Sequence, residues 1–357
     1  MKTYKLGEVC ELSKGKTITR ATSREGEVPV IAGGLGPTYF HDVDNRKPPV
    51  ITISASGANA GFVNYWDIPI WASDCTTIVE KPGSPASIGY IYKYLQSRQD
   101  FINSELRRGS AQPHVYPSDI ASLEILLPSL EKQQKIVEKL DTAFVELDSL
   151  EMNLGLSMKV ANELFGSVLS SELTRAKSES WQEVSLKEIC DVDWGNTKLT
   201  KSSYVDGGTY LAVSAAGADG LIDHFEHEAD VPVLSAIGAQ CGRMFFPGAR
   251  FTAIKNTITL TPKNGVIDGK FLYYLFTHVD LPQRGAGQPF ISKGDIEVFT
   301  VRIPKSLETQ REIVAKLDGT FSEIELLRSQ FKLKKDFTRA LRQSLLSSSF
   351  KGEVEVA

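Results

Sequence analysis

The chain carries two copies of one sequence pattern, and this duplication constrains its fold more than any other feature. The matching blocks keep the same order, and their separation stays close to 180 residues throughout. The matched pairs are Leu6–Cys10 with Leu186–Cys190, Ser54–Gly61 with Ser235–Gly242, Tyr94–Leu95 with Tyr274–Leu275, Gly109–Pro113 with Gly285–Pro289, and Leu130–Asp141 with Leu307–Asp318. Repeats of this kind predict two modules that are built in the same way.

Each copy begins with short β-branched runs separated by Gly, Pro, Asn and Asp, a pattern typical of strands joined by tight turns. Examples are Val50–Ile53, Thr76–Val79, Val231–Leu234 and Thr257–Leu260. A helix is expected to follow these runs, around 84–107 in the first copy and 267–279 in the second. The pattern predicts a compact α+β globule in each copy.

Each copy ends in a long segment with the periodicity of an amphipathic helix. From Glu131 to Leu173 the sequence has no proline, and apolar residues recur every three or four positions. The second such segment runs from Leu307 to about Leu346 and becomes more polar at Lys335 and Thr338. The side chains predicted to pack against another helix are Ile136, Leu140, Phe144, Leu147, Leu150, Leu154, Ile313, Leu317, Phe321, Ile324, Leu327 and Phe331.

Two arrangements of the long helices fit this pattern, because each helix would pack either on its own globule or on the other helix. Mutual pairing is favoured, since neither apolar face has a second long helix nearby in the sequence. The predicted α+β architecture then has two similar globules separated by two antiparallel helices, with pseudo-two-fold symmetry. Its predicted domains are 1–128 (globule), 129–175 (helix), 176–304 (globule) and 305–357 (helix).

Such a pair of helices would hold two similar modules at a fixed separation, and this suits a partner that repeats in space. Duplex DNA is such a partner, with a helical turn of about 34–36 Å. The charge speaks against a uniformly basic DNA binder, since 40 Lys and Arg face 44 Asp and Glu. The four predicted domains carry net charges of 0, −3, −3 and +2, so that any surface for DNA must be a local patch.

The sequence lacks the motifs of the common catalytic and cofactor-binding sites. Cys10–Thr17 ends like a phosphate-binding loop but has Cys10 in place of the first glycine, and Gly285–Gln288 lacks the third glycine of a dinucleotide loop. No Gly-x-Ser-x-Gly motif and no Asn/Asp-Pro-Pro-aromatic loop of an amino-methyltransferase occur. These absences favour a recognition protein over an enzyme.

The cysteines and the hydropathy indicate an intracellular protein without a metal. Cys10, Cys75, Cys190 and Cys241 form no Cys-x-x-Cys pair, and they are interpreted as reduced thiols of a cytoplasmic protein. No stretch approaches the 18 consecutive apolar residues of a membrane-spanning helix. We therefore expect no metal site and no membrane partner.

The blocks 128–141 and 304–318 resemble the start of the conserved helix in the specificity (S) subunits of type I restriction–modification enzymes. The family pattern is roughly Pro-Leu-x-Glu-Gln-x-x-Ile-Val-x-Lys-Leu-Asp. Here one residue is inserted ahead of the first glutamine, and Gln133 or Gln134, with Gln310 in the second copy, takes its place. Upstream, residues 53–63 and the two Gln-Pro loops are similar to blocks of the family's target recognition domains.

The resemblance implies a non-catalytic subunit that reads a bipartite site in double-stranded DNA, one half with each globule. It also implies that the paired helices set the gap between the halves and dock two modification (M) subunits, which carry S-adenosylmethionine. Restriction (R) subunits, which use ATP and Mg²⁺, would complete the nuclease. The chain itself would bind none of these cofactors.

Local basic clusters and loop amides are the candidates for DNA contact, because Lys and Arg bind phosphates whereas Arg, Asn and Gln read base edges. They are Lys14, Lys16, Arg20, Arg46, Lys47, Asn59, Arg107, Arg108, Gln112, Lys198, Lys201, Gln240, Arg243, Arg250, Lys255, Asn256, Arg284 and Gln288. The equivalence of Gln112 and Gln288 favours a structural role in their loops. Specificity is expected where aligned loops differ, as at Asn59 and Gln240, or at Phe62 and Arg243.

Two other functions remain open from the residues alone. A scaffold whose globules bind proteins, with the helices as a spacer, would have the same architecture. A free-standing methyltransferase or nuclease is disfavoured by the missing motifs.

Overall fold

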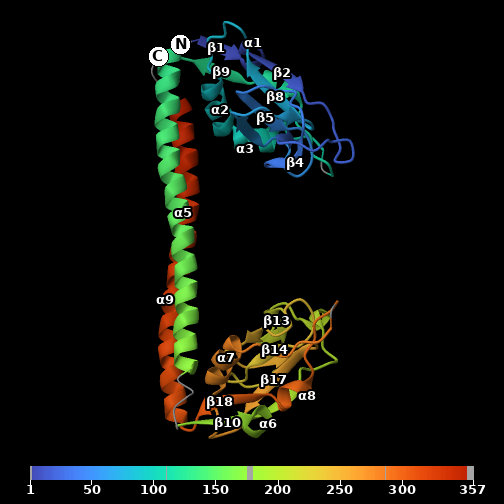
Figure 1. Ribbon diagram of the computed structural model, residues 1–357, viewed down its shortest axis with the longest axis vertical. Helices are drawn as coiled ribbons and strands as arrows, with labels where there is room; N and C mark the ends of the chain where they lie inside the picture. Colours follow the sequence, from blue (N-terminus) through green and yellow to red (C-terminus); the bar gives the residue numbers. More distant parts are fainter. Residues whose placement is uncertain (1, 110, 175–179, 286, 352–357) are drawn as a thin grey trace. The chain divides into compact units, whose positions relative to one another are not determined.

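The computed structural model describes residues 2–109, 111–174, 180–285 and 287–351. The fold is α+β, with two globules of short strands and two long helices that pack together (Figure 1). The predicted fold class and the pairing of the long helices are thus confirmed. Breaks at residues 154/155 and 331/332 divide the chain into two compact units, each with one globule and part of both long helices. The predicted boundary between residues 175 and 176 lies outside the described residues.

The globule of the first unit is built from three small sheets. β1 (Lys2–Lys5) pairs antiparallel with β9 (Glu124–Leu127). The four-stranded sheet is antiparallel and has the order β2 (Cys10–Lys14), β8 (Cys75–Glu80), β5 (Val50–Ser54), β6 (Val63–Trp66). The three-stranded sheet has the order β4 (Pro37–His41), β3 (Val28–Ile31), β7 (Trp71–Ala72), with β3 and β7 parallel. All five residues of β5 are buried, as expected of a central strand with both faces covered.

The globule of the second unit repeats this topology strand for strand. β10 (Trp181–Ser185) pairs antiparallel with β18 (Thr300–Pro304). The four-stranded sheet has the order β11 (Cys190–Trp194), β17 (Thr257–Pro262), β14 (Val233–Ser235), β15 (Met244–Phe245). The three-stranded sheet has the order β13 (Gly217–Ile222), β12 (Tyr210–Ser214), β16 (Phe251–Ala253), again with one parallel pair. The duplication seen in the sequence is therefore a duplication of the fold.

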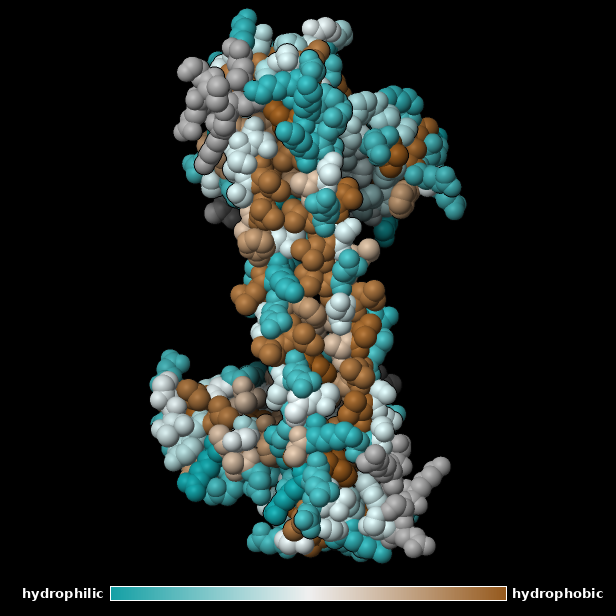
Figure 2. Space-filling model, turned by 90° about the vertical axis from the view of Figure 1, so that its left-hand side faces the viewer, coloured by the Kyte–Doolittle hydropathy of each residue, from teal (hydrophilic) through white to brown (hydrophobic). Residues whose placement is uncertain are grey.

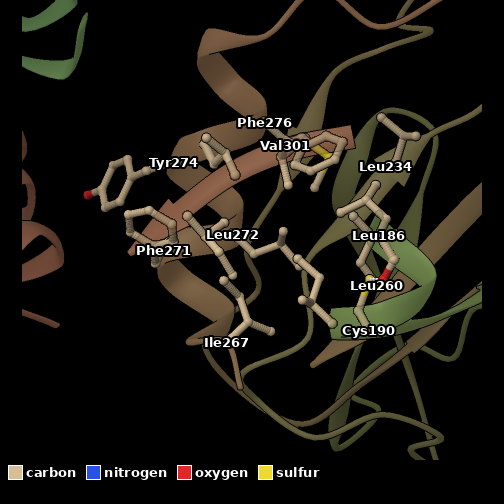
Figure 3. Packing of buried hydrophobic residues seen from close by; sticks show 14 of the residues in the cluster. Leu186, Cys190, Leu234, Leu260, Ile267, Phe271, Leu272, Tyr274, Phe276 and Val301 are labelled. Atoms are coloured by element: carbon tan, nitrogen blue, oxygen red, sulfur yellow. Dashed lines mark hydrogen bonds between the residues drawn. The ribbon is translucent and has the colours of Figure 1, made fainter. Parts of the chain in front are cut away.

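Short helices complete each globule. In the first they are α1 (Leu6–Val9), α2 (Ile88–Ser97), α3 (Gln99–Phe101), the π-helical turn η1 (Ile102–Leu106) and α4 (Pro117–Ala121). In the second they are α6 (Leu186–Ile189), the 3₁₀ turn η3 (Lys201–Ser203), α7 (Gly269–His278) and α8 (Lys293–Glu297). Helix α7 carries much of the second core, in which Phe271, Leu272 and Phe276 pack near Leu234 and Leu260 (Figure 3).

Helices α2 and α7 correspond with an offset of 181, one more than the sequence match of Tyr94 with Tyr274 predicted. Their N-caps are Ser87 and Asp268, whose side chains accept hydrogen bonds from the first turn. The six buried positions of α2 all recur in α7 at the same offset. The letters alone favour the offset of 180, with Tyr94 on Tyr274 and Leu95 on Leu275, whereas the N-caps and the pattern of burial favour 181.

A fully buried glutamine joins the start of each long helix to its globule. The side-chain oxygen of Gln133 accepts a hydrogen bond from the backbone N–H of Ser87 at 2.8 Å. Its amide nitrogen donates to the carbonyl oxygens of Pro85 and Pro128, at 2.7 and 3.0 Å. Gln134, in contrast, is exposed and bonds only within its helix, to Glu138. The structure thus identifies Gln133 as the glutamine that the family pattern requires.

The second copy repeats this junction. The side-chain oxygen of Gln310 accepts from the backbone N–H of Asp268 at 2.8 Å. Its amide nitrogen donates to the carbonyl oxygens of Val266 and Pro304, at 3.2 and 3.0 Å. In both copies one amide group therefore links the end of the last strand, the start of the long helix and the N-cap region of α2 or α7.

A second junction lies two turns further along each long helix. In the first unit the ammonium of Lys93, although buried, pairs with the carboxylate of Asp141 at 2.5 Å. In the second unit the hydroxyl of Tyr274, at the position equivalent to Lys93, donates to Asp318 at 2.6 Å. Burial and the Asp318 carboxylate raise the pKa of Tyr274, so that it remains a donor. The aspartate is the same in both copies, whereas the residue at the position of Lys93 changes from a cation to a phenol. In the second copy the cation comes from Lys270, whose ammonium pairs with Asp318 at 2.8 Å.

The long helices, α5 (Leu130–Thr174) and α9 (Leu307–Lys351), run antiparallel in the first unit. Leu140, Phe144 and Leu147 of α5 form a buried cluster with Leu346 of α9. Phe350 packs against the Tyr90 and Tyr94 rings of the globule, with ring centroids 5.1 and 5.8 Å apart. Helix α9 therefore contacts both its partner helix and the first globule.

The two long helices also run antiparallel in the second unit. Leu169 and Leu173 of α5 lie in one cluster with Ile313, Val314 and Leu317 of α9. The Phe165 and Phe321 rings lie 5.8 Å apart, and Arg328 donates to Asn162 at 2.7 Å. These pairs put later residues of α5 beside earlier residues of α9, as an antiparallel arrangement requires.

Not all residues of the predicted helix contact are covered. Leu140, Phe144, Leu147, Ile313, Leu317 and Ile324 are buried, Ile136, Leu154 and Phe331 are half-buried, and Leu150, Phe321 and Leu327 are exposed. Thr338, which seemed to interrupt the apolar pattern, is fully buried and donates its hydroxyl hydrogen to the Lys334 carbonyl. The helix accepts this polar residue because its hydroxyl bonds within the helix itself.

The buried glutamine gives the first testable prediction. Replacing Gln133 by Ala should lower the free energy of unfolding by about 2–3 kcal/mol, because the three hydrogen bonds of a fully buried amide are lost. Gln134→Ala is the matched control and should change this free energy by less than about 0.5 kcal/mol. Urea unfolding followed by tryptophan fluorescence measures both. Equal effects of the two substitutions would contradict the role given to Gln133.

Candidate nucleic-acid interface

The block Ser54–Gly61 and its copy Ser235–Gly242 each form a closed turn after a buried strand, here called the glycine turn. Gly61 N–H donates to the Ser54 carbonyl at 2.8 Å, and Gly242 N–H donates to the Ser235 carbonyl at 2.9 Å. Gly57 and Gly238 have φ of 82° and 103°, a region in which a side chain is strained. The turns therefore have the same backbone in both globules, and they differ in the side chains that they present.

The second loop, here called the Gln-Pro turn, runs from Arg108 to His114 in the first globule and from Arg284 to Phe290 in the second. Residues 110 and 286 lie outside the described residues. Two hydrogen bonds of 2.8–2.9 Å between the end residues close each turn. The turn then joins the glycine turn, because Gly57 N–H donates to Pro113 O at 3.0 Å and Gly238 N–H to Pro289 O at 2.9 Å. The structure thus brings Asn59 near Gln112, and Gln240 near Gln288.

A hollow lies beside these turns in each globule. In the first it measures about 190 Å³ and is lined by Lys14, Ala55, Asp74 and His114 among others. In the second it measures about 230 Å³ and is lined by Lys201, Gln240, Lys255 and Asn256, together with small apolar residues. Asn256 has a φ of 69°, which asparagine tolerates better than most residues. Four candidates from separate parts of the second copy therefore meet at one hollow.

Many of the basic candidates already have an acidic partner. The pairs are Lys47 with Asp44, Arg108 with Asp119, Lys201 with Asp219, Arg250 with Glu228, and Arg284 with Asp295. In the part of the chain that the structure describes, the side chains of Lys14, Lys16, Lys198 and Lys255 are exposed and have no such partner. The positive field of both surfaces is therefore weaker than the count of Lys and Arg suggests.

The remaining candidates lie apart from the hollows or serve the loops themselves. Arg20 lies over the Tyr39 ring of β4 at 6.0 Å, and Arg250 lies over the Phe225 ring at 4.6 Å. Arg107 donates to the Ala58 carbonyl of the glycine turn at 2.5 Å. Arg243 donates to Gln240 at 3.1 Å. Arg107 and Arg243 thus hold the glycine turns in shape, whatever further contact they make.

Arg46 is committed to the fold of the first globule. Its guanidinium donates to the hydroxyls of Thr77 and Ser13, at 2.9 and 3.0 Å. It also donates to the backbone carbonyls of Asn45 and Lys14, at 2.8 and 3.0 Å. A guanidinium that joins several segments in this way supports the sheet edge, and little of it is left for a phosphate.

The sequence analysis missed two acidic residues at this interface, Asp119 and Asp295, which bind the first arginine of each Gln-Pro turn. They are separated by 176 residues, as are Arg108 and Arg284 and the two turns themselves. This shared offset is the signal that would have identified them.

The described residues hold no group of three or more His, Cys, Asp or Glu side chains placed to bind a metal ion. His224 lies 3.5 Å from Glu226, as one member of a pair rather than of a group of three. None of the helices among these residues is long and apolar enough to cross a membrane. All four cysteines are free thiols. The candidate interface is therefore one of side-chain amides, lysines and arginines on constrained loops.

Comparison with known proteins gives the family. The model of the type I restriction modification DNA specificity domain matches residues 1–153 and 178–333, one match in each copy. The specificity subunit of the type I restriction enzyme EcoDI from Escherichia coli is 22% identical over 409 aligned positions, which cover 99% of this chain and 88% of that protein.

Solved structures show the same fold. A chain solved in work on complex assembly and conformational transition of the type I R-M system is 17% identical, with a TM-score of 0.77, and the match covers 98% of this chain and 97% of that one. The HsdS subunit from Thermoanaerobacter tengcongensis is 18% identical, with a TM-score of 0.54 and coverage of 98% and 96%.

The position of Arg46 gives the second prediction. Arg46→Ala should lower the free energy of unfolding by about 1–3 kcal/mol, because four hydrogen bonds are lost. Lys47→Ala, the adjacent control, removes only an exposed ion pair and should cost less than about 0.5 kcal/mol. Thermal and urea unfolding measure both variants. Unchanged stability of Arg46→Ala together with weaker DNA binding would instead assign Arg46 to DNA.

Proposed function

Because this chain belongs to the type I restriction–modification DNA specificity family and is a non-catalytic specificity subunit of such a system, we propose that each globule reads one half of a bipartite DNA site. One observation carries the proposal. The two globules have the same topology and the same pair of joined turns, yet the glycine turns present different side chains. Equal scaffolds with unequal contact residues suit a protein that reads two different half-sites.

The contact residues are proposed from the differences between the copies. Asn59 and Gln240 occupy equivalent positions on the glycine turns, and each amide suits the edge of an adenine in the major groove. Phe62 of the first copy is replaced by Arg243 in the second. Lys201, Lys255 and Asn256 line the same hollow as Gln240 and are proposed to share its half-site.

The charge supports weak DNA binding by the chain alone. The first globule is neutral and the second has a net charge of −3. Several candidate cations are also held in ion pairs, so that few counterions would be released from DNA on binding. The modification subunits are therefore proposed to supply many of the phosphate contacts. They would carry S-adenosylmethionine, while the restriction subunits would use ATP and Mg²⁺ in the same cytoplasmic complex.

The outer faces of the long helices support docking of modification subunits. In the first unit, α5 exposes Val145 and Met152, and α9 exposes Leu333 and Phe337. In the second unit the exposed apolar residues are Leu156, Val160, Leu164 and Leu326. Figure 2 shows apolar side chains at the surface of the helices. Exposed apolar side chains in such numbers suit a protein interface, and we assign this one to the modification subunits.

The third prediction tests the DNA function. Sequencing that detects methylated bases should show one bipartite methyladenine motif in cells with this gene and none of it after deletion. Insertion of seven residues into both α5 and α9, about 10 Å of helix, should then lengthen the gap of the motif by up to about three base pairs. Seven residues keep the apolar faces in register, whereas a two-residue insertion turns them by about 200° and is a control that should abolish methylation.

The outcomes of this experiment separate the proposals. If deletion removes no motif, the chain is a scaffold that binds proteins. If deletion removes the motif but the longer helices leave its gap unchanged, the globules read DNA while another element sets the spacing.

The fourth prediction tests docking on the helices. The double variant Leu333→Ser and Phe337→Ser should keep the melting temperature, since both side chains are about two-thirds exposed. It should nevertheless co-purify with modification subunits at least tenfold less, and it should lose the gel shift that these subunits confer. Asp336→Ser, between the two positions, is the control and should behave like the natural chain. Tight, specific DNA binding by the natural chain alone would contradict the proposed division of labour.

A further inference from the structure

The Gln-Pro turn carries the same ion pair in both globules. Arg108, the first residue of the first turn, binds the carboxylate of Asp119 at 2.8 Å. Arg284 binds Asp295 in the same way in the second turn. Each aspartate lies in the first turn of the short helix that follows, α4 or α8. The aspartate side chains are largely covered, at 18% and 15% exposure, whereas the arginine side chains are more than half exposed.

The backbone of the turn is held just as firmly. Gly109 and Gly285 have φ of 92° and 87°. A Cβ at these positions would lie 2.9 Å from the carbonyl oxygen of Gln112 and 2.5 Å from that of Gln288, so that only glycine fits. The turn is therefore closed by its end residues, tightened by a glycine and anchored by an ion pair, in both copies alike.

A hydrogen bond that braces the glycine turn is also present in both copies, although the donor side chain differs between them. The residue before the first arginine is Arg107, which donates to the Ala58 carbonyl at 2.5 Å. In the second copy that position is Gln283, which donates to the Cys241 carbonyl at 3.2 Å. A brace that persists while its side chain changes indicates that the position of the turn itself is what matters.

The Gln-Pro turn presents an exposed side chain that is the same in both globules. Gln112 and Gln288 are exposed, and within the described ranges their amides have no hydrogen-bond partner in the protein. A side chain that is identical in both globules is poorly suited to tell two different half-sites apart. What the two halves of a DNA site share is the sugar–phosphate backbone, whose oxygens accept hydrogen bonds from glutamine amides.

We propose, on the basis of the function proposed above, that the Gln-Pro turn grips the phosphate backbone in the same way in both half-sites. Gln112 and Gln288 donate to phosphate oxygens, and Asp119 and Asp295 are positioning residues that hold the turns through Arg108 and Arg284. Discrimination between bases is left to the glycine turn and the hollow beside it. The turn thus sets the depth and register at which the neighbouring residues meet the base edges.

The test uses the full chain in complex with its modification subunits and duplexes that carry the methylated site. Gln112→Ala and Gln288→Ala should each weaken binding about 3- to 10-fold, as the loss of one hydrogen bond predicts. The loss should be the same for the correct site and for duplexes with a base pair changed in either half. Gln134→Ala, a glutamine remote from the turns, should bind like the natural chain.

A neutral phosphate identifies the contact directly. A methylphosphonate placed at each position in turn should weaken binding by the natural complex at one phosphate per half-site. At that phosphate in the first half-site, the Gln112→Ala complex should lose nothing further, and Gln288→Ala should behave likewise in the second.

The positioning role has its own readout. Asp119→Asn keeps the shape of the side chain but removes the charge. It should weaken DNA binding no more than Gln112→Ala does. The two substitutions combined should be no worse than Gln112→Ala alone, because the aspartate acts through the turn. A purely structural aspartate would instead give additive losses and a lower melting temperature, and that result would overturn its role.

The outcomes also separate this inference from the proposed function. If Gln112→Ala relaxes the preference at one base pair of the first half-site, the turn reads bases and the inference is wrong, while the proposed function stands. If the natural complex does not prefer the bipartite duplex at all, the proposed function itself fails. The exposed glutamines keep the test valid even if the aspartate variants do not fold.

Discussion

A single buried amide at the start of each long helix is the contact on which the rest of the structure depends. Gln133 and Gln310 are fully buried, and each bonds one backbone N–H and two carbonyls of other segments. A buried polar group of this kind tolerates only one arrangement of the three segments that it joins. The long helix therefore leaves its globule in a defined direction, and the Asp141 and Asp318 contacts two turns later hold it there. The junction therefore also fixes how the glycine turn and the Gln-Pro turn of each globule are placed relative to its end of the long helix.

The long helices have two apolar surfaces with different tasks. The inner surface, with Leu140 and Leu317, is buried in the helix pair and stabilises the fold. The outer surface leaves residues such as Met152 and Phe337 in water, which contributes nothing to the stability of the chain alone. Such exposure is expected where a partner covers the helix in the assembled complex. The same amphipathic pattern thus serves folding on one side and, as proposed above, assembly on the other.

Ion pairing explains how a nearly neutral chain can serve as a specificity subunit. Several of its cations are neutralised locally and are used to hold loops, as Arg108 and Arg284 are. Ion pairing of this kind weakens the general attraction between the chain and DNA. It also orders the loops whose amides are proposed to discriminate between bases. The weak binding proposed for the chain alone would also make recognition dependent on the assembled complex.

The sequence by itself determined the duplicated architecture, because a repeat offset and an apolar period of three to four residues survive in the order of the letters. It also singled out the Gly-rich and Gln-Pro blocks, since glycine and proline record backbone constraints directly. Only the tertiary structure decided which residues of those blocks act together. It selected Gln133 over Gln134, moved the match of α2 and α7 by one residue, and assigned Arg46 to the fold. It also revealed the Arg108–Asp119 and Arg284–Asp295 pairs. The physical reason is that burial and hydrogen bonding depend on which distant segments meet in space. A shift of one residue between the two copies changes neither the composition nor the apolar periodicity of the sequence.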